Sequence, residues 1–147
     1  MQLAGSVTIN APREQVWKFL TDPYAVSQCA PGFESLEIII PDKEFKGVGS
    51  VGLGSVKAKF TGTVTWVELD PPNRAKLAAR GTAPGSAVEA SSEMTLSDGP
   101  DGSTEMNWVA DITVLGTLAS LAARVMGSVT RQLTAEFFDC VRAKIQG

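Results

Sequence analysis

The chain has 147 residues and a formal net charge of −3, with 44% of residues hydrophobic and 20% charged. These values are typical of one globular domain, spanning residues 1–147, that buries an ordinary core. The negative charge and the lack of a Lys/Arg cluster argue against nucleic-acid binding. The sequence contains no histidine. This excludes Ser-His-Asp and Cys-His catalysis and removes the commonest zinc ligand, so we expect neither a metal nor a cofactor.

Seven segments are predicted to be strands: most alternate between apolar and polar residues, the period of a strand with one buried face, while the second is an apolar run and the third is weaker and rich in glycine. They cover residues 3–9, 35–40, 45–51, 56–69, 74–82, 88–96 and 104–114. Two short helices are predicted between the first two strands. The first opens at Pro12 and stops at Thr21, and the second, over residues 24–30, has Asp22 as its N-cap and Pro23 at its first position. Because short turns join the strands, we expect antiparallel pairing.

The last third of the chain predicts one long amphipathic helix over residues 118–145. Its apolar residues recur at steps of three and four, which places them on one face. They are Leu118, Leu121, Ala122, Val125, Val129, Leu133, Phe137, Val141 and Ile145. Such a helix needs a large apolar surface to cover, and the predicted sheet supplies one. We therefore expect an α+β fold in which the helix lies across a curved sheet.

The inner face of the predicted sheet mixes large and small side chains. An inner face of this kind more often belongs to a packed core than to a ligand site. Small residues opposite a helix, however, also leave room for a ligand. We therefore predict a ligand cavity lined by Phe60, Val64, Trp66, Met94, Met106, Trp108, Leu121, Val125 and Val129. Its mouth is predicted at Trp17, Tyr24, Gly49, Gly52 and Gly54.

Residues 47–52 formally match the GxGxxG pattern of nucleotide-binding loops. We reject that interpretation because a strand is predicted to follow, so no helix N-terminus would face a phosphate. The glycines instead indicate a bent hairpin. Elsewhere, Glu89 and Glu93 are predicted to share a solvated edge of the sheet rather than to form an acid–base pair.

Two cysteines, Cys29 and Cys140, stand far apart and show no metal-binding spacing. We expect both to be free thiols in the core, which fits a reducing cytoplasm. The N-terminal residues lack a secretory signal pattern, and the least polar stretch, residues 114–123, is too short to span a bilayer. The expected location is therefore the cytoplasm.

Several stretches resemble the CoxG family of carbon monoxide dehydrogenase subunits, within the START-like or SRPBCC helix-grip superfamily. They are Gly5, Ala11-Pro12, Val16-Trp17, residues 20–23, Pro31-Gly32, residues 54–62, residues 68–72, residues 116–119, Arg124 and Phe137-Phe138. These stretches cover nearly the whole chain, and their order is more specific than any one of them.

The resemblance implies a seven-stranded antiparallel sheet wrapped around the C-terminal helix, with an apolar cavity between them. It also implies a non-catalytic accessory role beside a molybdenum hydroxylase of the carbon monoxide dehydrogenase type, in membrane association and in handling lipophilic quinone. Many relatives continue past the long helix into a membrane-anchoring tail, whereas this sequence ends at Gly147. We therefore expect at most a peripheral association with the inner face of the membrane.

Three functions remain open. The first is binding of a hydrophobic small molecule, such as a quinone or an isoprenoid-like lipid, without catalysis. The second is a cyclase or hydratase acting on an apolar or polyketide-like substrate, for which Tyr24, Ser92 and Thr104 are the inward polar candidates. The third is an interaction protein whose cavity is only its core. The missing histidine favours binding over catalysis.

Overall fold

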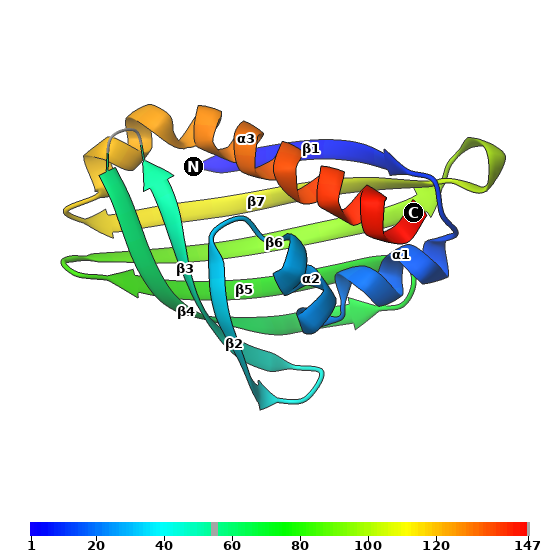
Figure 1. Ribbon diagram of the computed structural model, residues 1–147, viewed down its shortest axis with the longest axis horizontal. Helices are drawn as coiled ribbons and strands as arrows, with labels where there is room; N and C mark the ends of the chain where they lie inside the picture. The colour runs from blue at the N-terminus through cyan, green and yellow to red at the C-terminus, as the bar shows by residue number, and fades with distance from the viewer. Residues whose placement is uncertain (54–55, 147) are drawn as a thin grey trace.

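The computed structural model of the protein describes residues 1–53 and 56–146. Within these ranges the chain forms seven strands, three α-helices and one turn of 3₁₀ helix (Figure 1). The strands are β1 (Gln2–Ile9), β2 (Phe33–Ile40), β3 (Glu44–Leu53), β4 (Val56–Asp70), β5 (Arg74–Ala83), β6 (Ser86–Asp98) and β7 (Thr104–Gly116). The helices are α1 (Arg13–Leu20), α2 (Pro23–Cys29) and α3 (Ala119–Gln146), with η1 (Pro100–Gly102) as the 3₁₀ turn.

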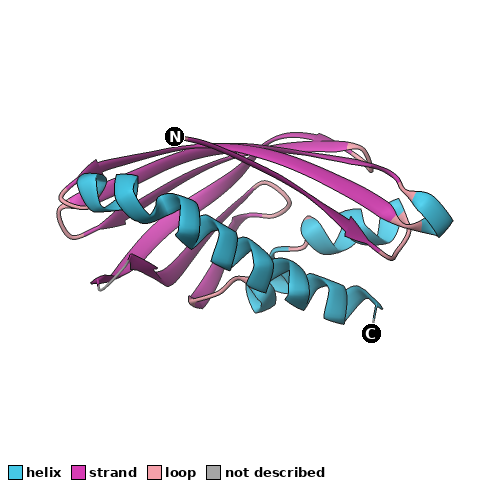
Figure 2. Ribbon diagram, turned by 90° about the horizontal axis from the view of Figure 1, so that it is seen from above, coloured by secondary structure: helices cyan, strands magenta, loops and turns pink. Residues whose placement is uncertain are grey.

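The seven strands form one antiparallel sheet in the order β1-β7-β6-β5-β4-β3-β2. Each strand from β2 to β6 pairs with the next one along the chain, as short turns favour, and β7 also pairs with β1. The predicted seven-stranded antiparallel sheet is thus confirmed. Figure 2 shows the sheet curving over α3, which crosses one of its faces as a single long helix.

The two short helices start where the sequence places their signals. The Asp22 carboxylate accepts hydrogen bonds from the backbone N–H groups of Tyr24, at 3.0 Å, and Ala25, at 3.4 Å. Asp22 is therefore the N-cap of α2, and Pro23 occupies the first helical position, where its missing N–H costs nothing. Helix α1 begins one residue after Pro12, which lies at its N-cap position.

The tightly packed part of the core lies at the C-terminal end of α3. Ile9 of β1, Val16 of α1 and Val141 of α3 are fully buried there. Thr104, at the start of β7, is also fully buried, and its hydroxyl donates to the Ala11 carbonyl at 2.7 Å. This end of the molecule is solid, so any large cavity must lie further toward the N-terminus of α3.

The prediction of two free thiols is wrong, because Cys29 and Cys140 form a disulfide with their Cα atoms 5.4 Å apart. Cys29 ends α2 and Cys140 lies in the last two turns of α3, so the bond joins helices separated by 111 residues. Sequence periodicity cannot reveal this pairing, because it depends on where α2 meets α3. Since disulfides are rare in a reducing cytosol, the cysteines no longer support a cytoplasmic location.

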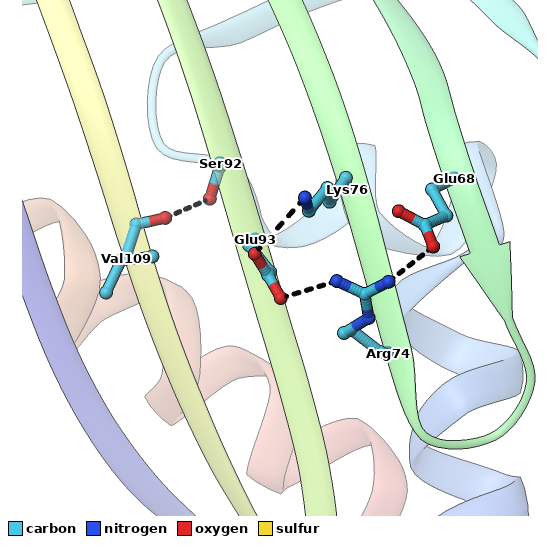
Figure 3. Close-up of polar contacts among 6 residues, drawn as sticks. All are labelled: Glu68, Arg74, Lys76, Ser92, Glu93 and Val109. Carbon is cyan, nitrogen blue, oxygen red and sulfur yellow. Dashed lines mark hydrogen bonds and ion pairs between the residues drawn. The ribbon is translucent and has the colours of Figure 1, made fainter.

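The outer face of the sheet carries a network of ion pairs centred on Arg74 of β5 (Figure 3). Arg74 bonds Glu68 of β4 and, at 2.9 Å, Glu93 of β6, which also lies 3.7 Å from Lys76. The hydrogen bond from Arg74 holds the pKa of the Glu93 carboxyl below its ordinary value, with desolvation opposing it and Lys76 assisting. Glu93 is thus held in its charged form by basic neighbours.

Glu89 lies on the same outer face, where it pairs with Arg80 at 3.1 Å. The predicted surface role of Glu89 and Glu93 is confirmed, although β6 is an interior strand rather than an edge. Each carboxylate pairs with a different arginine on β5, so the two do not act as a coupled acid–base pair.

Candidate ligand-binding cavity

Two adjoining hollows lie between the inner face of the sheet and α3. We call them the tryptophan compartment, of about 400 Å³, which Trp66 and Trp108 line, and the glycine compartment, of about 530 Å³, which Gly47, Gly49 and Gly62 line. They share a boundary formed by Ala30, Pro31, Ile112, Thr130, Leu133 and Thr134. We therefore treat them as two parts of one cavity.

The tryptophan compartment is built by strands β4 to β7 and roofed by α2 and α3. Met94 of β6 and Met106 of β7 lie beside the two tryptophans on its floor. Gly5 of β1 makes room for the Trp108 indole, because a Cβ at Gly5 would lie 2.8 Å from Trp108 Cζ2. Any side chain at position 5 would therefore push Trp108 toward the compartment.

The glycine compartment is bounded by the hairpin of β3 and β4. Gly47 faces Gly62 in the strand register, and a Cβ on Gly62 would lie only 2.7 Å from the Arg80 carbonyl oxygen. Phe33 of β2 packs its ring against Gly47. Because these glycines have no side chains, the wall is thin and the compartment keeps more empty volume. Because β4 follows β3 as an antiparallel partner, the rejection of a nucleotide loop is confirmed.

The structure brings seven of the nine predicted lining residues to the cavity. Trp66, Met94, Met106 and Trp108 line the tryptophan compartment, and Phe60, Val64 and Val129 line the glycine compartment. Leu121 and Val125 are half-buried on the flank of α3 and line neither compartment.

The face of α3 that meets the cavity is rotated from the predicted stripe. Ala122, Met126, Thr130 and Thr134 follow one another at steps of four and line the glycine compartment. Periodicity of apolar residues alone missed Thr130 and Thr134, because both are polar. The step of four from the buried Ala122 was the signal that could have found them.

The predicted mouth residues are scattered rather than gathered. Gly49 lines the glycine compartment, but Gly52 does not, and Gly54 lies outside the described residues. Trp17 packs against the solid core, and Tyr24 is 60% exposed on the outside of α2. Residues of α2 and the turn after it come closer to the cavity, namely Val26, Ala30 and Pro31.

Few polar side chains face the cavity. Among the described residues, no carboxylate, amine or thiol lines either compartment. Arg80 borders the glycine compartment, but its side chain is 77% exposed and pairs with Glu89. The Ser92 hydroxyl, on the wall of the tryptophan compartment, donates to the Val109 carbonyl at 2.9 Å (Figure 3).

The other two polar candidates lie elsewhere. Thr104 is fully buried and bonded to the Ala11 carbonyl, while Tyr24 is exposed and contributes to neither compartment. No group of three or more Cys, Asp or Glu side chains that could hold a metal occurs in the described ranges. The cavity is therefore an apolar space bordered by a few hydroxyl groups.

A third hollow, the β1 groove, runs between β1 and α3 and has a volume of about 580 Å³. It shares Trp108, Thr130 and Thr134 with the tryptophan compartment. Its outer wall is charged, since Arg131, Asp139 and Arg142 line it. The apolar cavity and this polar groove thus meet at the middle of α3.

A curved antiparallel sheet that grips one long C-terminal helix over an apolar cavity defines a helix-grip protein. Solved structures share this fold. A conserved protein from Geobacillus kaustophilus is 27% identical, with a TM-score of 0.91 over 99% of this chain and 95% of that one. The ZhuI aromatase/cyclase from Streptomyces sp. R1128 is 19% identical, with a TM-score of 0.73 over 99% and 93% of the two chains.

Residues 5–146 match the CoxG family of carbon monoxide dehydrogenase subunits, and the chain belongs to that family. The family predicted from the ordered motifs is thus confirmed. A comparison with curated proteins found no match.

Proposed function

We propose that this protein binds a hydrophobic small molecule, a quinone or an isoprenoid-like lipid, in the cavity between the sheet and α3. The main support is that two adjoining compartments lie beneath α3 and that their walls are apolar apart from a few hydroxyls. Each compartment has a volume within the range of small-molecule sites, roughly 300–1,000 Å³. A merely structural core would be packed there as densely as it is around Val141.

Burial of apolar surface would supply the affinity. A ligand that removes ~300 Å² of apolar surface from water gains about 7 kcal/mol, before the costs of ordering ligand and protein. The two tryptophans and two methionines of the tryptophan compartment offer large, adaptable contact surfaces for a planar ring. The glycine compartment offers further length for an apolar tail.

The family suggests the biological setting. Because the chain belongs to the CoxG family, we propose that it serves a molybdenum hydroxylase of the carbon monoxide dehydrogenase type as an accessory protein. We further propose that it makes peripheral contact with the bilayer, where lipophilic quinones reside. Within the described ranges, no helix has the length and apolarity that a membrane span requires.

Catalysis of the cyclase or hydratase type finds less support. Such an enzyme needs ionisable groups that converge on the substrate, and the described lining offers only Arg80, whose exposed side chain pairs with Glu89 on the outer face. The likeness to an aromatase/cyclase at 19% identity concerns the fold. We therefore favour binding as the function of this cavity.

Tryptophan fluorescence tests the proposal, because Trp66 and Trp108 line the cavity whereas Trp17 does not. Titration with decylubiquinone should quench the wild-type emission in a saturable manner. The Trp17→Phe variant should keep this quenching, and the Trp66→Phe/Trp108→Phe variant should lose most of it. Absence of saturable quenching in the wild type, or equal quenching in both variants, would contradict binding in the cavity.

A further inference from the structure

Thr130 and Thr134 occupy an unusual position on α3. They lie one helical turn apart, and both border the tryptophan compartment, the glycine compartment and the β1 groove. Both residues are only half-exposed. They are the point at which the three hollows meet, so a molecule that fills the cavity must pass close to them.

Neither hydroxyl has a hydrogen-bond partner among the described residues. A hydroxyl within a helix normally points to solvent or bonds a carbonyl of the preceding turn. Other helical hydroxyls here follow that rule: Ser128 donates to the Val125 carbonyl at 3.1 Å, and Thr21 to the Trp17 carbonyl at 2.8 Å. Thr130 and Thr134 make no such bond, and neither oxygen is among the buried unpaired atoms of the described residues, so both hydroxyls are reached by water and are available to a ligand at this junction.

The surroundings decide what kind of ligand atom would suit these donors. Ser92, across the tryptophan compartment, already donates to Val109. In the β1 groove, Arg142 lies 3.3 Å from Asp139, and the exposed Arg131 lies along α3 near Gly127. Among the described residues, no cationic group therefore lies inside the two compartments, where it could neutralise an anionic ligand. A neutral oxygen that accepts hydrogen bonds fits best.

We propose that Thr130 and Thr134 form a hydrogen-bonding site for a carbonyl oxygen on a neutral, otherwise apolar ligand. This inference rests on the proposed function and adds to it the chemical group that the cavity recognises. Side chains at i and i+4 of a helix are neighbours, so both hydroxyls can reach the same polar head group. The apolar body of the ligand would then extend into the two compartments. Trp108 borders the same junction and would contact the head group.

Isosteric substitution tests this site. The Thr130→Val/Thr134→Val variant keeps side-chain volume and removes both donors. Dissociation constants are measured for two probes, decylubiquinone, which carries carbonyl groups, and decylbenzene, which carries none. We expect the variant to bind decylubiquinone about tenfold more weakly, in line with the loss of one or two neutral hydrogen bonds, and to bind decylbenzene as the wild type does.

Two controls accompany the variant. Thr130→Ser/Thr134→Ser retains both donors and should retain the affinity for decylubiquinone. Ser128→Ala removes an exposed hydroxyl from the same helix and should change neither affinity. Thermal unfolding of each variant confirms that it is folded.

Each remaining outcome overturns the inference. Unchanged affinity of the valine variant for decylubiquinone would overturn this site while leaving the proposed function standing. An equal loss for both probes would show that the threonines act through packing alone. Tighter binding of palmitate than of decylubiquinone, lost in Arg131→Ala, would show that the site selects an anion. Failure of the wild type to bind any probe would overturn the proposed function together with this inference.

Discussion

The disulfide between Cys29 and Cys140 fastens the last residue of α2 to α3, beside the tryptophan compartment. It closes a loop of 111 residues, and Val26, in the same helix as Cys29, lines that compartment. The bond thus joins the two helices that roof the tryptophan compartment. Its loss should affect both the stability of the fold and the position of α2.

The Cys29→Ser/Cys140→Ser variant should be less stable than the wild type by about 2–5 kcal/mol, because the closed loop restricts the unfolded chain. Chemical denaturation measures the difference. Reductant should lower the stability of the wild type to that of the variant and should leave the variant unchanged. A variant as stable as the oxidised wild type would show that the bond contributes nothing.

Introducing a side chain at Gly5 should displace Trp108. In Gly5→Val the new atoms would meet the indole, since even a Cβ would lie 2.8 Å from it. We expect a loss of roughly 1–3 kcal/mol of stability and a shift in tryptophan emission. Gly52→Ala is the control, because no atom of the described residues lies within 4 Å of a Cβ at Gly52. Equal effects of the two substitutions on stability would contradict the described packing.

Filling the cavity should separate ligand binding from stability. Ala90 of β6 lines the glycine compartment, whereas Ala78 of β5 borders a hollow on the outer face. Ala90→Leu should weaken binding of decylubiquinone at least tenfold without unfolding the protein, because the added side chain occupies empty space. Ala78→Leu should leave binding unchanged. Isothermal titration measures both, and equal binding by the two variants would argue against use of the glycine compartment.

The ion pairs of Glu93 predict a dependence of stability on pH. The hydrogen bond from Arg74 lowers the pKa of Glu93, so the stabilising contribution is present above the pKa of the unfolded chain and is lost as pH falls through the lower folded value. Glu93→Gln should therefore lower the melting temperature at neutral pH, and the difference from wild type should shrink in acid. The effect should be small and weakened by salt, because the group is solvent-screened.

Glu89→Gln is the matched control, since Glu89 pairs with the single, largely exposed Arg80. Its effect at neutral pH should be smaller than that of Glu93→Gln. A difference between wild type and Glu93→Gln that persists unchanged into acid would contradict the role of the Glu93 charge.

Local patterns predicted most of the fold. Alternation along β4 and β7, the Asp22-Pro23 start of α2 and the apolar period of α3 each reflect one element and its immediate surroundings, so the sequence alone reveals them. The order of motifs indicated the family because it samples nearly the whole chain.

Long-range geometry could not be predicted in the same way. The Cys29–Cys140 bond depends on how α2 meets α3, over a separation of 111 residues. The inward face of α3 depends on the angle at which the helix crosses the sheet, and a small rotation exchanges Leu121 and Val125 for Met126 and Thr130. The empty volume itself is a property of packing that no local pattern encodes.

Native mass spectrometry of the intact protein, before and after extraction with organic solvent, tests the central claim most directly. The protein incubated with decylubiquinone should carry one extra mass, equal to that of the probe, and extraction should remove it. The Ala90→Leu variant should show much less of this species. A mass equal to that of the bare chain under all conditions would contradict the claim that the cavity between the sheet and α3 is a binding site.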